Sequence, residues 1–448
     1  MNDYNAQYQS KLISADEAVR CVKYRDHIFY SECGLFPEAL DDALSRQMDV
    51  LKGIHLRSGG FSRIPKIVEA DPKREHVLMS DWSGGPGSRS LREKNLCSDI
   101  SLCGHLGSRA LDQYRTFDVA FLATSAMDKN GYFNYGAANS MTASVLDKAK
   151  LIILEVNSSV PYCYGGGGES IHISKIDYIV EGAHAPLADV QPATPGKVDR
   201  RIAEHILKEI EDGACLRLGV DALSVQIAQM VAESDLKDLG IHTDVLTDAC
   251  VDLHQAGIAT GACKSVDAFK MAYTVAAGTN KLYNFLDHNL ACVSYPASYI
   301  YDPKIIAKNN KVVALSEARE IDLYGQACCQ GGRQEGQAGM GGALDFMLGA
   351  FLSKGGKGIL TISSTYLDRD GTWRSRIVPS LAPESIVTVP ASIVQYVATE
   401  YGMVQLAGKS TGERADALIG IAHPDFREDL IREALRMKLW ISGSKHSS

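Results

Sequence analysis

Short, almost wholly apolar runs that alternate with helical patterns constrain the fold of this chain most. Residues 118–124 read Asp-Val-Ala-Phe-Leu-Ala-Thr, and residues 151–157 read Leu-Ile-Ile-Leu-Glu-Val-Asn. Such runs are typical of strands covered on both faces, because a strand with one face in water alternates apolar and polar residues. Strands that alternate with helices form the βαβ connections of a parallel sheet. The sequence therefore predicts an α/β fold with largely parallel sheets.

A proline-rich stretch divides the chain into two parts. Residues 185–196 contain three prolines among small and polar residues, a composition typical of an extended linker. The 448 residues are enough for two or three domains, each with its own core. We therefore predict an N-terminal α/β domain over residues 1–190 and a C-terminal α/β domain over residues 191–448.

Composition and charge argue against several classes of protein. The net charge of −8 provides no basic surface, so we expect neither a nucleic acid nor a membrane as partner. No apolar run reaches the length of a membrane-spanning helix, and the polar first ten residues lack the apolar core of a signal peptide. The eleven cysteines are scattered along the chain, which favours reduced thiols and a cytoplasmic location.

The adjacent pair Cys328 and Cys329 is the cysteine feature most similar to a metal motif. A zinc site usually has further Cys or His ligands at characteristic spacing, and no second pair accompanies this one. We expect no metal ion and no tightly bound cofactor.

The stretch 236–260 contains a carboxylate that is well placed for chemistry. Apolar residues recur at helical spacing from residue 246 to residue 253, and Gly257 follows, so the pattern predicts a helix from about Val245 to Ala256. Asp244 would then lie at the helix N-terminus, where the helix dipole favours an ionised carboxylate able to attack a thioester carbonyl. In the alternative interpretation, Thr243 or Asp244 only caps the helix.

Two motifs resemble a known family of enzymes. Residues 239–244 read Leu-Gly-Ile-His-Thr-Asp, and residues 339–346 read Gly-Met-Gly-Gly-Ala-Leu-Asp-Phe. Both are similar to the 4-hydroxybutyrate and acetate CoA-transferase family, which also contains enzymes named acetyl-CoA hydrolases. The resemblance extends over nearly the whole chain and is strongest from residue 339 onward. It implies a homodimer with two open α/β domains that face each other across an active-site cleft.

The resemblance also implies which residues are catalytic. In the family the residue after His-Thr is usually Glu, and its carboxylate carries the acyl group and then CoA; Asp244 stands there in this chain. The backbone N–H groups of Gly341 and Gly342, and those of the turn that contains Leu223, would form an oxyanion hole. Ser316 replaces the Asn that often faces the catalytic carboxylate.

Other positions would bind CoA, or are positions at which this chain differs from the family pattern. The loop Gly339, Met340, Gly341 and Gly342 would meet CoA, since glycine leaves backbone N–H groups free to approach a ligand. Lys409 would meet a CoA phosphate, or is a solvated surface lysine. Asp221 stands where the family commonly has Gly, and its charge would oppose an oxyanion if it pointed inward. Glu320 and Asp322 match the family, and we interpret them as structural hydrogen-bonding groups.

Three functions are compatible with these residues. A CoA-transferase would use Asp244 to form an acyl anhydride and then an aspartyl-CoA thioester, with acyl-CoA and a small carboxylate as substrates. An acyl-CoA hydrolase would use the same carboxylate to direct water. An acyltransferase with another acceptor, or a CoA-binding protein without transferase activity, is the third possibility, because a fold hosts many functions.

Overall fold

The structure is a computed structural model that describes residues 3–48, 50–330 and 341–439. Its N-terminal half is built on a sheet of seven strands in the order β4-β3-β2-β1-β5-β7-β9. Every pairing between neighbouring strands in this sheet is parallel. The strands are β1 (His27–Tyr30), β2 (Ile54–Ser58), β3 (Val77–Asp81), β4 (Ser98–Asp99), β5 (Phe117–Thr124), β7 (Ala149–Val156) and β9 (Tyr178–Glu181).

The C-terminal half contains a second sheet, of six strands in the order β11-β10-β16-β19-β23-β24. All of its pairings are parallel except that of β24 with β23. The strands are β10 (Cys215–Arg217), β11 (Gly240–Ile241), β16 (Val312–Glu317), β19 (Lys357–Thr361), β23 (Tyr396–Thr399) and β24 (Gly402–Gln405). The predicted α/β fold with two largely parallel sheets is confirmed.

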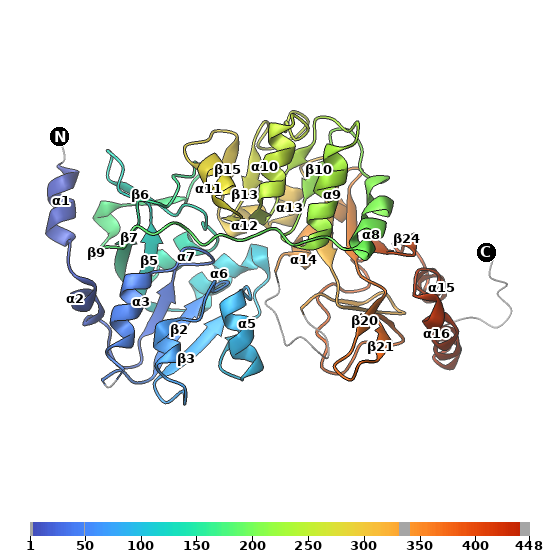
Figure 1. Cartoon of the computed structure of the whole chain (residues 1–448), viewed down its shortest axis with the longest axis horizontal. Helices are drawn as coiled ribbons and strands as arrows, with labels where there is room; N and C mark the ends of the chain where they lie inside the picture. Colours follow the sequence, from blue (N-terminus) through green and yellow to red (C-terminus); the bar gives the residue numbers. More distant parts are fainter. Residues whose placement is uncertain (1–2, 49, 331–340, 440–448) are drawn as a thin grey trace.

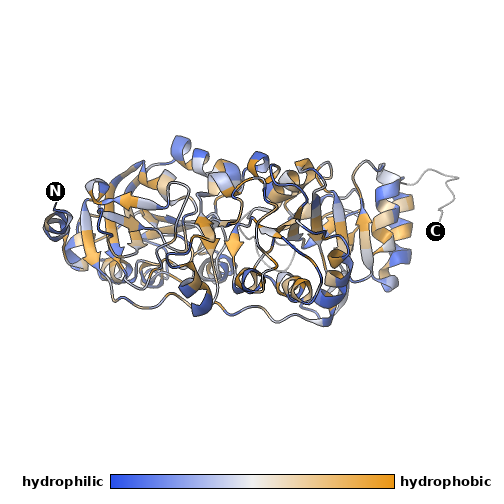
Figure 2. Cartoon of the chain, turned by 90° about the horizontal axis from the view of Figure 1, so that it is seen from above, coloured by the Kyte–Doolittle hydropathy of each residue, from blue (hydrophilic) through white to orange (hydrophobic). Residues whose placement is uncertain are grey.

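Helices cover the two sheets, as long parallel crossovers require. Figure 2 shows hydrophobic residues concentrated in the strands and hydrophilic residues on the outer turns of the helices. The N-terminal half contains α1 (Tyr4–Lys11), α2 (Ala15–Val19), α3 (Glu38–Ser45), α4 (Lys66–Glu69), α5 (Pro86–Glu93), α6 (Gly104–Tyr114) and α7 (Thr142–Leu146). The C-terminal half contains α8 (Lys197–Leu207), α9 (Ala222–Ala232), α10 (Asp248–Gln255), α11 (Asn280–Leu286), α12 (Ala297–Ile300), α13 (Pro303–Ile306), α14 (Ala343–Leu352), α15 (Thr411–Gly420) and α16 (Pro424–Arg436).

The proline-rich segment runs across the molecule between the two sheets (Figure 1). Residues 182–196 form neither helix nor strand, the last strand of the first sheet ends at Glu181, and α8 begins at Lys197. The boundary between residues 190 and 191 falls within this segment and stays a prediction.

Small strands join the two halves along a seam. The strand β12 (Val245–Leu246) pairs with β14 (Val275–Ala276), and Val275 also forms an isolated bridge with Ala138 of the N-terminal half. Backbone hydrogen bonds continue this contact, with the Ala276 amide donating to the Ala137 carbonyl at 2.7 Å. The seam therefore brings the chain just after Asp244 close to the segment 137–140.

The remaining strands form short ladders around the two main sheets. They are β6 (Tyr132–Asn134) with β8 (Ser170–His172), β13 (Met271–Tyr273) with β15 (Cys292–Ser294), β17 (Glu320–Asp322) with β18 (Ala327–Cys328) and β22 (Ile377–Val378), and β20 (Thr365–Leu367) with β21 (Trp373–Ser375). The interpretation of Glu320 and Asp322, which lie in β17, as structural hydrogen-bonding groups is confirmed. Glu320 accepts the Ser385 hydroxyl at 2.8 Å, and Asp322 accepts the amide and the side chain of Gln326.

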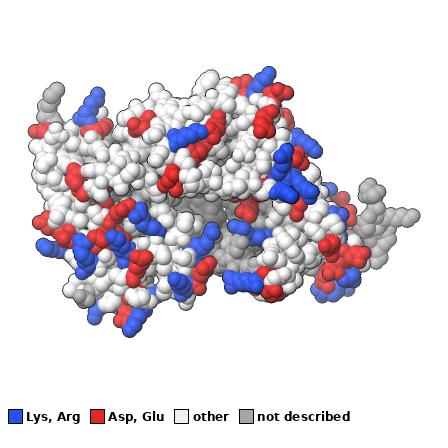
Figure 3. Space-filling view, viewed as in Figure 1, with Lys and Arg blue, Asp and Glu red and all other residues white. Residues whose placement is uncertain are grey.

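Figure 3 shows that basic and acidic side chains are intermixed on this face instead of forming one basic patch. Within the described part of the chain, no helix combines the length and the apolar character needed to cross a bilayer.

Candidate active site

Asp244 lies in an extended turn, four residues before the helix begins. Val245 and Leu246 form β12, Thr247 is the N-cap, and α10 starts only at Asp248. The predicted helix start at Val245 is therefore wrong, and so is the assignment of Thr243 or Asp244 as its cap. The physical reason is pairing with β14, which satisfies the backbone of this turn: the Val275 amide donates to the Asp244 carbonyl at 3.0 Å.

An arginine on the neighbouring strand holds the Asp244 carboxylate. The Nε and Nη2 atoms of Arg217 donate to its two oxygens at 2.9 Å and 2.8 Å. The two side chains are only 13% and 6% exposed, so the pair is largely shielded from water. Burial opposes a charged guanidinium, but the neighbouring carboxylate raises the pKa of Arg217 above its ordinary value. A bidentate counter-ion thus replaces the helix dipole as the group that stabilises the charge of Asp244.

Arg217 is a functional candidate that sequence reasoning did not identify. It stands in the otherwise apolar run Cys-Leu-Arg-Leu at residues 215–218. A charged residue in a buried strand needs a partner, and this was the available signal. The sequence could not identify the partner, because Asp244 lies 27 positions further along the chain.

The glycine motif meets the Asp244 turn through Phe346. The guanidinium carbon of Arg217 lies 5.2 Å from the centre of the Phe346 ring, and the His242 ring contacts the same ring edge to face at 6.2 Å. Phe346 belongs to the first turn of α14, and its amide donates to the Gly342 carbonyl at 2.9 Å. The structure therefore brings Gly342 near the Arg217–Asp244 pair.

Gly341 and Gly342 would each resist substitution for a different reason, backbone conformation at Gly341 and lack of space at Gly342. Gly341 is exposed and has a φ of +53°, a left-handed conformation that favours glycine. Gly342 is buried at the N-cap of α14, where an added Cβ would lie 2.4 Å from a ring carbon of Tyr301. Gly339 and Met340 lie outside the described residues.

Gly342→Ala is expected to destabilise the fold by about 1–3 kcal/mol, because the new methyl group overlaps the Tyr301 and Phe346 rings. Gly341→Ala is the matched control, since its Cβ would meet nothing within 4 Å and costs only the backbone strain of about 1 kcal/mol. Urea unfolding of the two variants measures the difference. Equal destabilisation would contradict the close approach at Gly342.

The carboxylate of Asp221 is directed to the start of α9. It accepts the amide and the hydroxyl of Ser224, both at 2.9 Å, and so acts as the N-cap of that helix. The Gly219 amide in turn donates to the Ser224 hydroxyl at 2.8 Å. Leu223 is the second residue of α9 and precedes Val225, whose amide makes the first backbone bond of the helix. Its N–H group is thus among those that a helix leaves without an intrahelical acceptor.

Ser316 lies at the end of β16, one residue after Leu315, whose carbonyl accepts from Nη1 of Arg217. Its hydroxyl is buried and lacks a hydrogen-bond partner in the described part of the chain. Ser316 therefore adjoins the Arg217–Asp244 pair through the backbone of β16.

Lys409 lies far from these residues. It follows β24, which is five strands from β11, or about 24 Å at the usual spacing between strands. Because β24 is antiparallel to β23, its end also faces the opposite rim of the sheet. The structure does not bring Lys409 together with Asp244.

The N-terminal half contributes a buried carboxylate, that of Glu32, close to the seam. Sequence reasoning did not identify this residue. Glu32 follows β1, where functional side chains of a parallel sheet commonly gather, and it is fully buried. It accepts the Ser140 hydroxyl at 2.8 Å, the Met141 amide at 2.9 Å and the Trp82 indole N–H at 3.1 Å. Glu32 thereby fixes the segment that bridges to Val275.

Glu32 is expected to make stability depend on pH. Burial raises its pKa from an ordinary value of 4.5 to about 7, against the effect of its three donors. Between these values the folded state keeps a proton that the unfolded state releases, so this contribution to stability decreases as the pH rises through this window. Glu32→Gln should reduce the slope of the urea midpoint between pH 5 and about 7. Glu69→Gln, at an exposed position, is the control, and an unchanged slope in Glu32→Gln would contradict the assignment.

The chain is similar to known proteins over nearly its whole length. Models of the acetyl-CoA hydrolase/transferase N-terminal and C-terminal domains match residues 94–191 and 278–434. The butyryl-CoA:acetate CoA-transferase of Anaerostipes caccae is 39% identical over 448 residues, which cover 99% of this chain and 100% of that protein. The 4-hydroxybutyrate coenzyme A transferase of Clostridium kluyveri is 35% identical over 432 residues, 95% of this chain and 97% of the relative.

A solved structure agrees with these relatives. The crystal structure of RipA from Yersinia pestis superimposes with a TM-score of 0.89 at 31% identity, and the match covers 98% of this chain and 100% of that one. Fold, sequence and family models therefore lead to one conclusion: the chain belongs to the acetyl-CoA hydrolase/transferase family.

Proposed function

We propose that this protein is an acyl-CoA:carboxylate CoA-transferase in which Asp244 is the carboxylate that reacts. The observation that carries the proposal is a buried carboxylate beside the seam, next to the glycine turn, in a chain similar over its full length to named CoA-transferases. Butyryl-CoA and acetate are the substrates to test first, because they appear in the name of the relative from Anaerostipes caccae.

The reaction would proceed in two covalent stages. An oxygen of Asp244 attacks the thioester carbonyl and forms a C–O bond, the C–S bond then breaks, and the CoA thiolate leaves while an acyl anhydride remains on Asp244. The thiolate then attacks the aspartyl carbonyl and releases the acyl group as a carboxylate, which leaves an aspartyl-CoA thioester. A second carboxylate reverses these steps and departs as the new acyl-CoA.

Arg217 would govern the first step. Both oxygens of Asp244 are engaged by its guanidinium, so one of the two hydrogen bonds has to open before attack. The guanidinium can then stabilise the oxyanion that forms when the thiolate adds to the aspartyl carbonyl. Backbone N–H groups of Gly341, Gly342 and Leu223 are the proposed donors to the substrate oxyanion.

Hydrolysis is the second candidate, and the bidentate pair favours it. A carboxylate held through both oxygens, on a side chain one methylene shorter than Glu, is retracted by about 1.5 Å from a substrate placed for the longer residue. In that arrangement Asp244 would direct a water molecule at the thioester without forming a covalent bond.

One experiment separates the two candidates. The protein is incubated with butyryl-CoA, with and without acetate, and then treated with borohydride or hydroxylamine and analysed by mass spectrometry. Label on Asp244 together with acetate-dependent formation of acetyl-CoA supports transfer. Free CoA released at the same rate without acetate, and no label on Asp244, supports hydrolysis. If neither acetyl-CoA nor free CoA is formed, both candidates are contradicted, and the chain is a CoA-binding protein without either activity.

Three further properties complete the proposal. The family resemblance supports a homodimer and contact of Lys409 and the loop 339–342 with CoA, and the scattered cysteines support a cytoplasmic location. Light scattering on the purified protein tests the homodimer, and the CoA affinity of Lys409→Ala tests the phosphate contact.

A further inference from the structure

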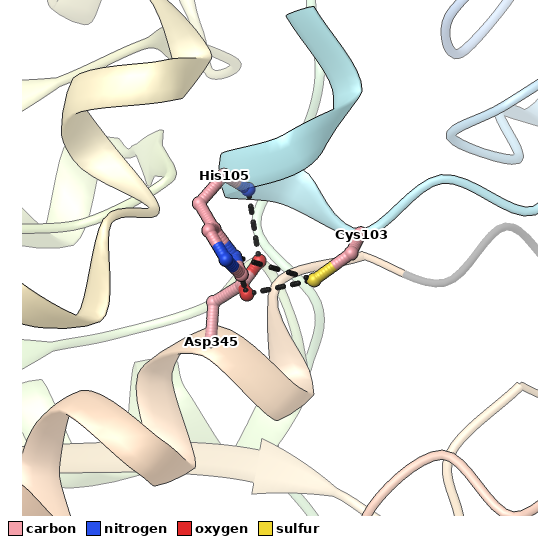
Figure 4. A group of neighbouring side chains, drawn as sticks. All are labelled: Cys103, His105 and Asp345. Atoms are coloured by element: carbon pink, nitrogen blue, oxygen red, sulfur yellow. Dashed lines mark hydrogen bonds and ion pairs between the residues drawn. The ribbon is translucent and has the colours of Figure 1, made fainter. Parts of the chain in front are cut away.

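Three side chains with metal-binding atoms meet between the two halves of the molecule, as Figure 4 shows. Cys103 and His105 lie at the start of α6 in the N-terminal half, and Asp345 lies in the first turn of α14 in the C-terminal half. The Asp345 Oδ1 atom is 2.9 Å from the Cys103 Sγ atom and 2.6 Å from the His105 Nδ1 atom. Sγ and Nδ1 are 3.3 Å apart, so the three atoms form a closed triangle.

The three donors are those that Zn²⁺ prefers. Thiolate, imidazole and carboxylate are its usual protein ligands, and open sites hold three of them with a fourth position for water. Zinc bonds of about 2.0–2.3 Å in a tetrahedron separate the ligand atoms by about 3.3–3.8 Å. The separation of 3.3 Å between Sγ and Nδ1 already lies in this range. Oδ1 lies 2.6 Å from Nδ1 and 2.9 Å from Sγ, so the Asp345 carboxylate has to move away from these atoms by roughly 0.4–0.7 Å. Ordinary side-chain rotations provide such a movement.

The charges at the cluster favour a cation. Asp345 has a side chain only 1% exposed, and its partners are Cys103 and His105. Over residues 3–48, 50–330 and 341–439, no lysine or arginine forms an ion pair with it, in contrast to Asp244 with its Arg217. A buried carboxylate without a permanent positive partner is costly, and a bound cation removes that cost.

We propose that Cys103, His105 and Asp345 form a binding site for a zinc-class divalent cation that links the two halves of the protein. On binding, the thiol proton of Cys103 passes to solvent and the imidazole proton moves to Nε2, so that Sγ, Nδ1 and Oδ1 each donate an electron pair to the ion. The doubly charged ion then balances one thiolate and one carboxylate. His105 is 29% exposed on its side chain, which leaves a path for the ion and for a water ligand.

The site would act on the glycine motif through α14. Asp345 is adjacent to Phe346, whose ring packs against Arg217, and Gly342 precedes the same helix. A cation bound across α6 and α14 would hold the first turn of α14 against the N-terminal half. The inference does not depend on the reaction that the protein catalyses.

Metal titration of the full-length protein tests this site directly. After treatment with a chelator, the protein is titrated with Zn²⁺ by calorimetry and, separately, with Co²⁺ by absorption spectroscopy. We expect one ion per chain and a near-ultraviolet charge-transfer band from a Co²⁺–thiolate bond. Cys103→Ser should remove this band, and Cys103→Ser and His105→Asn should each weaken Zn²⁺ binding by about a hundredfold or more.

The control variant is Cys21→Ala, which removes a half-buried free cysteine elsewhere and should bind Zn²⁺ like the unchanged protein. Circular dichroism of each variant establishes that it is folded before its titration is interpreted. The proposal is overturned if the unchanged protein binds Zn²⁺ no more tightly than Cys103→Ser, or if its Co²⁺ complex lacks the thiolate band. In that case the three side chains form only a hydrogen-bonded contact between the halves.

Discussion

Asp244→Ala is expected to reduce the formation of acetyl-CoA from butyryl-CoA and acetate by about a thousandfold or more, because it removes the proposed covalent carboxylate. Loss of the nucleophile in a covalent mechanism typically leaves only the rate that binding and oxyanion stabilisation provide. The rate is measured by following acetyl-CoA chromatographically at saturating substrates.

A stability control is needed, because Asp244→Ala also leaves Arg217 buried without its partner. Arg217→Met/Asp244→Leu removes both charges and replaces them with apolar groups, which is often neutral for stability. This double variant should be folded and still inactive. Transfer at more than about a tenth of the original rate in either variant would contradict the proposed role of Asp244.

Arg217→Met is expected to destabilise the protein by about 3–5 kcal/mol, because one charge of a buried pair then lacks its counter-ion. Arg217→Met/Asp244→Leu should recover most of this loss. Urea unfolding of the two variants and the unchanged protein measures the coupling. If Arg217→Met is as stable as the unchanged protein, the pair is not buried as the structure shows.

The α/β fold could be predicted because a strand that is buried on both faces is recognisable from a short run of apolar residues. The runs at 118–124 and 151–157 are apolar on both faces, and they form β5 and β7, two neighbouring interior strands of the first sheet. The start of α10 could not be predicted in the same way. The apolar spacing of Leu246 and Leu253 fits a helix, but Val245 and Leu246 pair with a strand 30 residues away, and that pairing sets the local conformation.

The sequence by itself determined the parallel sheets, the carboxylate at residue 244 and the glycine motif near residue 341. Only the tertiary structure decided that Asp244 is paired with Arg217, that Asp221 caps α9, and that Cys103 and His105 meet Asp345. The physical reason is the separation along the chain of the residues that interact. Burial and helical periodicity are properties of neighbouring residues, whereas the charge partner of a buried group is chosen by packing between segments that are distant in the chain.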